Sequence, residues 1–259
     1  MLTSLQNPLI KQFRKLQQSR ERRMQGLFLL EGTNLVEAAI ARGLAFQTVL
    51  CTEQWTERHG ELLSGLLCDR LEQVTPEILQ KVATTVNPDG VVASLPQTAV
   101  AWQLPATLTL GVAIERLQDP GNLGTIIRTA TATSVDALLL SADSVSPEAP
   151  KVLRASVGAW FQTPALVVPD LAAQVQIYRQ QGVQIVATLP QAQKSYWDLD
   201  WRRPSLILLG NEGAGLSPEL AELADEQVTI PMAQGVESLN AAIACSLMLY
   251  EAKRQRQNP

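Results

Sequence analysis

Residues 206–213 read Leu-Ile-Leu-Leu-Gly-Asn-Glu-Gly, so a strand-length apolar run ends directly in a glycine-rich turn. Further apolar runs of this length lie at 137–140, 165–168 and 183–187. Such runs, separated by helical segments, are typical of a parallel sheet that is covered by helices on both faces. We therefore predict an α/β fold for this half of the chain. Ligands bind such sheets at the carboxyl ends of the strands, which is where Gly210 lies.

The first half of the chain shows its own alternation of helices and strands. Asn7-Pro8 predicts a helix start, because Asn is a common N-cap and proline fits the first helical turn. Strands predicted at 27–30, 48–51 and 91–95 indicate a small α/β/α sandwich. Residues 96–105 contain two prolines without periodicity, which indicates a linker. The predicted organisation is a domain over 1–95, the linker over 96–105 and a second domain over 106–259.

Charge is unevenly distributed along the 259 residues, whose formal net charge is −4. The first 26 residues contain six basic residues and one acidic residue, a local net charge of +5. Clustered positive charge favours phosphate binding more than total charge does. The basic residues predicted to contact a nucleic acid in this segment are Lys11, Arg14, Lys15, Arg22 and Arg23.

The few cysteines and the single histidine exclude several kinds of site. The three cysteines are widely spaced, without a Cys-x-x-Cys pair, and are predicted to be reduced thiols. His59 lies in a polar, turn-like stretch and is interpreted as a surface residue. A histidine-based hydrolytic triad and a histidine-rich metal site are thereby excluded, and no metal is predicted. No apolar run reaches the roughly 18 residues of a membrane span, and no signal peptide is recognisable, so a cytoplasmic protein is expected.

Three short motifs follow one another in the second half of the chain. The first is Gly121-Asn122-Leu123-Gly124-Thr125-Ile126-Ile127-Arg128-Thr129-Ala130. The second is Gly210-Asn211-Glu212-Gly213-Ala214-Gly215-Leu216-Ser217, and the third joins Ile230-Pro231-Met232 to Ser238-Leu239-Asn240. In this order and spacing they resemble the SpoU/TrmH family of RNA ribose 2′-O-methyltransferases, in the SPOUT class. The stretch from Asn7 to Gly32, together with Gly90-Val91-Val92-Ala93, more loosely resembles the ribosomal-protein-like substrate-binding domain that precedes many such catalytic domains. The alternative for this half is an interaction domain with a solvated basic helix.

The resemblance implies features that the residues alone do not. It implies a trefoil knot near the C-terminus, a homodimer through the knotted domain with the site near the subunit interface, and S-adenosyl-L-methionine as methyl donor. It also implies that backbone at Gly210, Ile230 and Leu239 holds the adenosine, with Thr188 and Met232 in the same pocket. A dinucleotide fold lacks support, because the glycines at 210, 213 and 215 are spaced G-x-x-G-x-G, the reverse of the dinucleotide fingerprint.

The resemblance also gives the candidate catalytic residues, which are Arg128, Asn122, Glu212, Ser238 and Asn240. A guanidinium is a poor proton acceptor at neutral pH, so Arg128 is expected to orient the ribose and stabilise charge. The sequence does not identify the general base that accepts the proton of the 2′-hydroxyl. Ser238 is predicted to cap a long helix that holds Asn240 in its first turn, and the residues from Ala241 onward are predicted to be buried core. Arg154 is expected near RNA phosphate.

The expected function is methyl transfer from S-adenosylmethionine to a ribose 2′-hydroxyl in structured RNA. Ribosomal RNA is the first candidate, because the N-terminal resemblance is to a domain used for rRNA, and tRNA is the second. A non-catalytic RNA-binding homologue of the same fold is the rival from another class, and methylation of a small molecule is a third possibility that the basic N-terminal segment disfavours.

Overall fold

The computed structural model describes residues 1–257, so the last two residues of the predicted domain 106–259 lie outside the described residues. The chain forms two compact units. Unit 1 contains Met1–Ala101 and Glu148–Phe161, and unit 2 contains Trp102–Pro147 and, of the described residues, 162–257. The sequence did not indicate that residues 148–161, which interrupt the second half of the chain, pack with the first.

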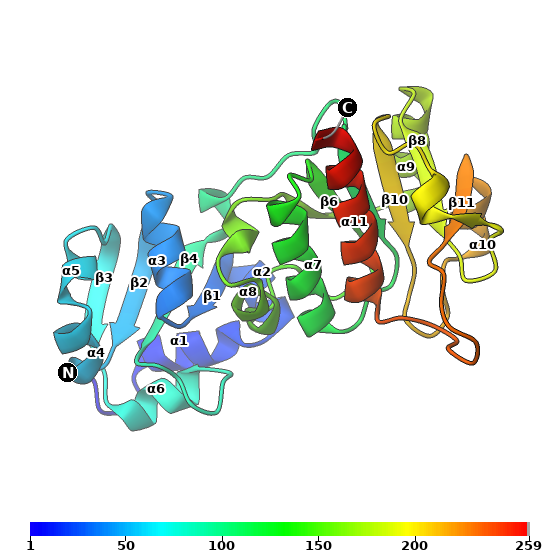
Figure 1. The fold of residues 1–259 in the computed structure, drawn as a ribbon. Helices are drawn as coiled ribbons and strands as arrows, with labels where there is room; N and C mark the ends of the chain where they lie inside the picture. Colours follow the sequence, from blue (N-terminus) through cyan, green and yellow to red (C-terminus); the bar gives the residue numbers. More distant parts are fainter. Residues whose placement is uncertain (258–259) are drawn as a thin grey trace. The chain divides into compact units, whose positions relative to one another are not determined.

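Unit 1 is built on a four-stranded mixed sheet in the order β1-β4-β2-β3, with β2 and β3 parallel and the other pairs antiparallel (Figure 1). Its elements are α1 (Pro8–Leu16), α2 (Ser19–Gln25), β1 (Leu27–Glu31), α3 (Thr33–Ala41), β2 (Phe46–Cys51), α4 (Glu53–Arg58), α5 (Gly60–Leu63), β3 (Cys68–Gln73), α6 (Pro76–Val82), β4 (Val91–Pro96), η1 (Gln97–Ala99), α8 (Pro150–Ser156) and η2 (Ala159–Phe161).

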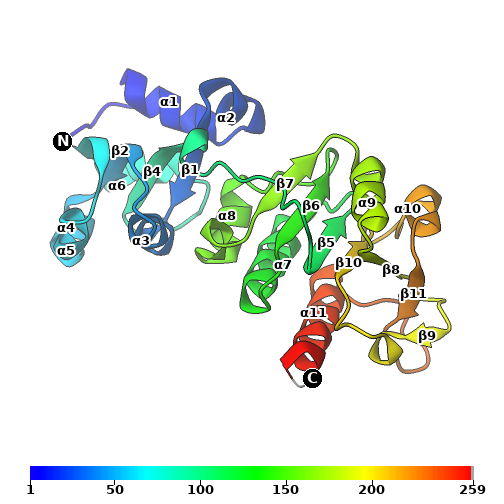
Figure 2. The same ribbon diagram turned by 90° about the horizontal axis from the view of Figure 1, so that it is seen from above.

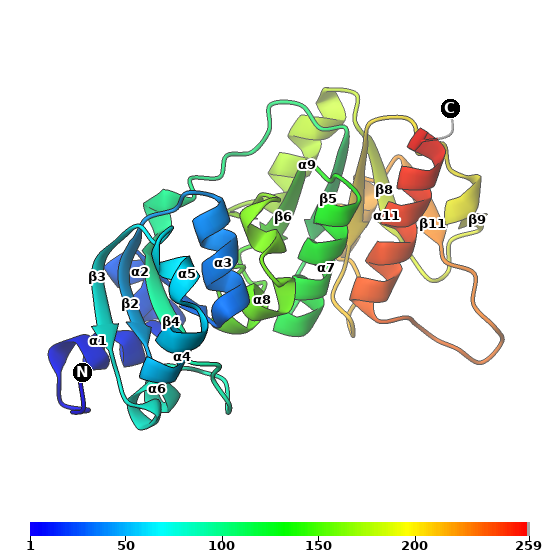
Figure 3. The same cartoon turned by 60° about the vertical axis from the view of Figure 1, so that its left-hand side comes forward.

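Helices cover both faces of this sheet. On one face, apolar residues of α1 and α6, among them Phe13 and Ile78, form a core with Leu29 of β1. On the other face Trp160 packs edge-on against Phe28 of β1, with ring centroids 5.1 Å apart. Figure 3 shows α3 and α8 side by side. The predicted strands and the start of α1 at Asn7 are confirmed, whereas β3 was missed because its exposed, charged sequence lacks an apolar run.

Unit 2 is built on seven parallel strands in the order β7-β6-β5-β10-β8-β11-β9. Its elements are β5 (Leu110–Ile114), α7 (Pro120–Ala132), β6 (Ala137–Ser141), β7 (Ala165–Val168), α9 (Leu171–Gln180), β8 (Gln184–Thr188), β9 (Lys194–Ser195), η3 (Tyr196–Asp198), β10 (Ser205–Leu209), α10 (Pro218–Glu222), β11 (Glu226–Thr229) and α11 (Ala241–Gln257).

Helices α9 and α10 lie on one side of this sheet, and α7 and α11 lie on the other (Figure 2). The predicted parallel sheet with helices on both faces is confirmed. Strands β9 and β11 were not predicted, because they are short and carry charged residues at one edge of the sheet. Within residues 1–257, no helix is both long and apolar enough to cross a membrane.

The last helix differs from its prediction in two ways. It begins at Ala241, and Asn240 caps it, because its side-chain oxygen accepts from the N–H groups of Ala242 at 3.0 Å and Ile243 at 3.3 Å. The prediction that Ser238 caps the helix, with Asn240 inside its first turn, was therefore wrong. The helix is also not buried all round, since Ile243, Leu247 and Tyr250 are 52%, 38% and 54% exposed.

Candidate functional site

A cavity of about 340 Å³ lies in unit 2 at the carboxyl ends of β8, β10 and β11. Its walls come from the ends of these strands, the loop after β10 and the start of α11; in Figure 3 the long loop runs out from β11 and returns to α11. Apolar residues form much of the lining, including Leu189, Leu209 and Leu216. Backbone of the glycine-rich turn and a few polar side chains complete it. A largely apolar hollow with a small polar set is typical of a small-ligand site.

All five residues predicted to hold the donor line this cavity, namely Gly210, Ile230, Leu239, Met232 and Thr188. They come from three separate loops, which the parallel sheet brings to one edge. The Thr188 hydroxyl lies 3.3 Å from the sulfur of Met248, which anchors it to α11. The sequence reasoning did not single out other lining residues, such as Leu189, Pro190 and Glu237. Their position within two residues of a predicted site residue was the available signal.

The turn after β10 is held by Asn211. Its side-chain oxygen accepts from the N–H groups of Gly213 and Ala214, both at 2.9 Å, and its amide donates to the carbonyl of Arg116 at 2.8 Å. The turn folds back so closely that a Cβ on Gly210 would lie 2.2 Å from the carbonyl carbon of Gly215. Glycine is therefore required at 210 by the protein's own backbone, whatever the ligand.

Three predicted catalytic residues form one hydrogen-bonded chain beside the cavity. The Asn240 amide donates to the Asn122 side-chain oxygen at 2.9 Å, and the Asn122 amide donates to the Glu212 carboxylate at 2.8 Å. Asp119 caps α7 by accepting from the backbone N–H of Asn122 at 2.8 Å, which fixes the start of that helix. The three motifs, far apart in sequence, thus meet through side chains.

The other two predicted catalytic residues stand apart from this chain. Ser238 lines the cavity without capping α11. Arg128 lies six residues beyond Asn122 on α7, about one and two-thirds turns, so it points to a different side of the helix. Its side chain is exposed, and within residues 1–257 it has no hydrogen-bond or ion-pair partner. Ile126 and Ile127 beside it are fully buried.

The basic residues predicted to bind RNA divide into two groups. Lys11, Arg14, Lys15 and Arg23 are exposed on α1 and α2 of unit 1.

Arg22 is only 3% exposed and donates to the carbonyls of Leu16 and Gln17, both at 3.0 Å, which closes the end of α1. Burial also lowers the pKa of its guanidinium. The buried position of the Arg22 side chain does not fit the prediction that Arg22 contacts RNA.

Arg154 also has partners within the protein. It forms an ion pair with buried Glu31 of β1 and donates to the Thr84 hydroxyl at 2.6 Å, all inside unit 1. These contacts join α8 to the edge of the unit 1 sheet. They give Arg154 a structural task where RNA phosphate was expected.

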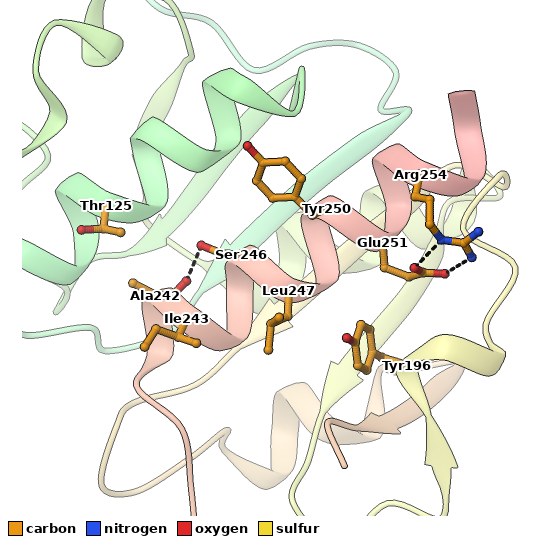
Figure 4. A pocket seen from close by; sticks show the side chains of 9 residues that line it. All are labelled: Thr125, Tyr196, Ala242, Ile243, Ser246, Leu247, Tyr250, Glu251 and Arg254. Carbon is orange, nitrogen blue, oxygen red and sulfur yellow. Dashed lines mark hydrogen bonds and ion pairs between the residues drawn. The ribbon is translucent and has the colours of Figure 1, made fainter. Parts of the chain in front are cut away.

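A second hollow, of about 450 Å³, runs along the exposed side of α11 (Figure 4). Ile243, Leu247 and Tyr250 project into it from successive turns, with Thr125 from α7 and Tyr196 at its borders. We call Ile243, Leu247 and Tyr250 the α11 stripe. Solvent-facing apolar side chains in a row are typical of an interaction surface.

The titratable groups give no indication of a metal. Within residues 1–257, no cluster of three or more His, Cys, Asp or Glu side chains is arranged to hold one. The three cysteines are free thiols, as predicted, and burial raises the pKa of Cys245 to about 12.

Two family models match the chain. Residues 109–250 match the SpoU rRNA Methylase family, and residues 7–93 match the MRM3-like substrate binding domain. The first match contains all three motifs, and the second contains the basic helices α1 and α2.

Several relatives and solved structures match over nearly the whole length. An uncharacterised tRNA/rRNA methyltransferase of Synechocystis sp. is 47% identical, over 98% of this chain and 94% of its own. The 23S rRNA (guanosine(2553)-2′-O)-methyltransferase of Bacillus subtilis is 30% identical, over 97% and 98%. The crystal structure of the SpoU methyltransferase AviRb from Streptomyces viridochromogenes, in complex with the cofactor AdoMet, superimposes with a TM-score of 0.87 at 32% identity, over 98% and 99%.

Proposed function

The chain belongs to the SpoU rRNA methylase family, and from this we propose that it transfers a methyl group from S-adenosylmethionine to a ribose 2′-hydroxyl of ribosomal RNA. The observation that carries the proposal is the hydrogen-bonded chain Asn240–Asn122–Glu212 beside a cavity lined by the five predicted donor residues. The near full-length match to a 23S rRNA 2′-O-methyltransferase supports the same reaction.

The residues that line the cavity fit the donor. When bound, S-adenosylmethionine supplies a methyl group activated on a sulfonium sulfur. Apolar side chains such as Leu209 and Ile230 suit a nucleoside base, and glycine at 210 lets the backbone approach a ligand closely. Thr188 and Ser238 offer hydroxyls that can bond a ribose or a carboxylate. We assign donor binding to backbone at Gly210, Ile230 and Leu239, with Thr188 and Met232 in the same pocket.

The protein must also orient the RNA ribose and provide a route for the proton that the 2′-hydroxyl loses. Asn122 is held from both sides, by Asn240 and Glu212, so its amide is fixed in orientation at the edge of the cavity. Such fixed groups align the attacking hydroxyl with the donor. Arg128 has no neutralising partner within the described chain, so its guanidinium is available for phosphate and for the charge that develops on the ribose oxygen.

The proposed substrate is ribosomal RNA, and unit 1 supplies the first contact with it. The side chains of Lys11, Arg14, Lys15 and Arg23 are exposed there and make no hydrogen bond to the described residues. We propose the cytoplasm as the location of the protein, because it is where the proposed substrate, ribosomal RNA, is found. A transfer RNA substrate is the alternative outcome of the substrate test.

The proposed molecule is a knotted homodimer. Strand β10 lies between β5 and β8 in the sheet although β8 precedes it in the chain, and α11 then packs back on α7, an order that supports a knot at the C-terminal end. The α11 stripe supports the dimer, because a second copy would cover its exposed side chains. Arg128 lies one turn from Thr125, which borders the stripe, so pairing would bring Arg128 to the interface.

The test is a single-turnover assay with isotopically labelled donor, on deproteinised rRNA and on tRNA from cells that lack the protein. We expect label in the ribose 2′-O position of rRNA. Donor binding is measured in parallel by calorimetry. A protein that neither binds donor nor transfers label would be a non-catalytic homologue, and the proposed activity would be wrong.

A further inference from the structure

One residue at the carboxyl end of β5 has an unusual backbone. Arg116 has a φ of 54°, in the left-handed region that residues other than Gly, Asn and Asp seldom adopt. Backbone strain of this kind persists where the surroundings hold it in place, and it concentrates at functional sites. Arg116 stands in the short loop between β5 and Asp119, the residue that caps α7.

Hydrogen bonds hold the Arg116 backbone from two sides. Its N–H donates to the Ser141 hydroxyl at 2.9 Å, at the end of β6. Its carbonyl accepts from the Asn211 amide at 2.8 Å. Asn211 adjoins Glu212, which bonds to Asn122, so the conformation of Arg116 is tied directly to the loop that completes the proposed site.

The Arg116 side chain is poorly neutralised. Its Nη2 lies 3.5 Å from the Glu115 carboxylate, the limit of a hydrogen bond, and that carboxylate already accepts from the Ser217 N–H at 2.7 Å. The guanidinium Nε is buried and has no partner within residues 1–257. The side chain is nevertheless 38% exposed, so part of its guanidinium faces solvent.

The charge around the site makes this cation unusual. The two loops at this edge of the sheet, residues 210–217 after β10 and 230–240 before α11, contain the carboxylate residues Glu212 and Glu237 and neither Lys nor Arg. In residues 110–122, which lead from β5 into α7, Arg116 is the only basic residue. RNA that brings a ribose to Asn122 brings the adjoining phosphate with it, because each 2′-hydroxyl neighbours the 3′-phosphate of its own nucleotide. Carboxylates at this edge repel a phosphate, so a cation in addition to Arg128 would favour its binding there.

We propose that Arg116 is a further RNA-binding residue, which contacts a backbone phosphate next to the nucleotide to be methylated. The inference rests on the proposed function and adds a contact to the same site. The strained backbone, held by Asn211 and Ser141, keeps the side chain at the carboxyl edge of the sheet. A planar guanidinium suits a phosphate because it can donate two parallel hydrogen bonds.

The test compares Arg116→Asn with Arg116→Lys in the full-length protein. Asparagine tolerates the left-handed conformation and removes the charge, and lysine keeps the charge. Arg203→Asn is the charge control, because Arg203 is exposed and precedes β10 at the opposite end of the sheet. Ser134→Asn is the backbone control, because Ser134 has φ of 60° at the far end of α7.

We measure equilibrium binding to rRNA against salt concentration, together with KM and kcat. Arg116→Asn should reduce the slope of log affinity against log salt by roughly 0.7–0.9, the amount expected when one phosphate is no longer neutralised. It should raise KM for RNA by about fivefold or more, while the donor Kd stays within about twofold of wild type. Arg116→Lys should retain most of the slope, and both controls should match wild type.

A slope for Arg116→Asn equal to that of Arg203→Asn would overturn the inference. A lowered thermal midpoint or donor affinity in Arg116→Asn, with an unchanged salt slope, would also overturn it by giving Arg116 a structural role. Failure of the proposed function is distinguishable, because wild-type protein would then bind RNA and transfer no methyl group.

Discussion

Arg128 carries a positive charge that no carboxylate of the described chain neutralises. If it orients the ribose and stabilises charge in the transition state, Arg128→Ala should reduce the single-turnover rate by about 10²-fold or more. The removal of one preorganised donor typically costs about 2.7–4 kcal/mol of barrier. Donor affinity and thermal midpoint should change little, since Arg128 is exposed. A near-normal rate at saturating RNA and donor would remove Arg128 from the catalytic residues.

Gly210 and Gly213 both line the cavity proposed to hold the donor, but the protein needs only the first to be glycine. A Cβ at 210 would lie 2.2 Å from backbone, whereas a Cβ at 213 would meet only the Asn211 side chain at 3.6 Å. Gly210→Ala should therefore weaken donor binding by at least tenfold and lower the thermal midpoint. Gly213→Ala is the matched control and should stay close to wild type in both measurements. Equal effects of the two variants would contradict this explanation of the turn.

At the level of the secondary-structure elements, α1 and α2 present the exposed basic residues of unit 1. Replacing Arg14, Lys15 and Arg23 together with glutamine should weaken rRNA binding. It should also reduce the salt slope by roughly 0.7–0.9 for each phosphate that the variant no longer neutralises.

The control for this triple variant removes the same charge from elsewhere on unit 1, with Arg42, Arg58 and Lys81 changed to glutamine, all three being exposed. Titrations of labelled rRNA at several salt concentrations measure both variants. An unaltered slope in the α1–α2 variant would mean that RNA binds another surface.

The α11 stripe gives a second prediction at this scale. Ile243→Glu should convert a dimer into a monomer, because it places a charge in an apolar interface. Ile177→Glu on α9 is the matched control, since Ile177 is similarly exposed, at 47%, on the opposite side of the sheet. Sedimentation or light scattering measures the molecular mass of the wild-type protein and of both variants in solution. A wild-type protein that is monomeric, or an Ile243→Glu variant that still pairs, would refute the proposed interface.

Over the whole molecule, the features that follow from local pattern could be predicted. Apolar runs such as 206–209 identified the central strands, because buried parallel strands have apolar residues on both faces. The residues predicted to hold the donor line one cavity, because the carboxyl ends of parallel strands meet at one edge.

Features that depend on tertiary packing could not be predicted. The burial of Arg22 depends on carbonyls at the end of α1, and the exposure of Ile243 depends on which side of α11 meets α7. The helix start shifted from Ser238 to Asn240 because both residue types cap well, and only the path of the preceding loop selects one. The return of residues 148–161 to unit 1 likewise depends on Trp160 meeting Phe28, over a hundred residues away in sequence.

The most direct test of the proposed activity is a map of ribose 2′-O-methylation across the ribosomal RNA of cells with and without this protein. We expect a 2′-O-methyl group to be missing from rRNA when the protein is absent. Wild-type protein should restore that group, and Arg128→Ala, expressed to the same level, should not. Identical rRNA maps with and without the protein would contradict the assignment of this chain as an rRNA 2′-O-methyltransferase.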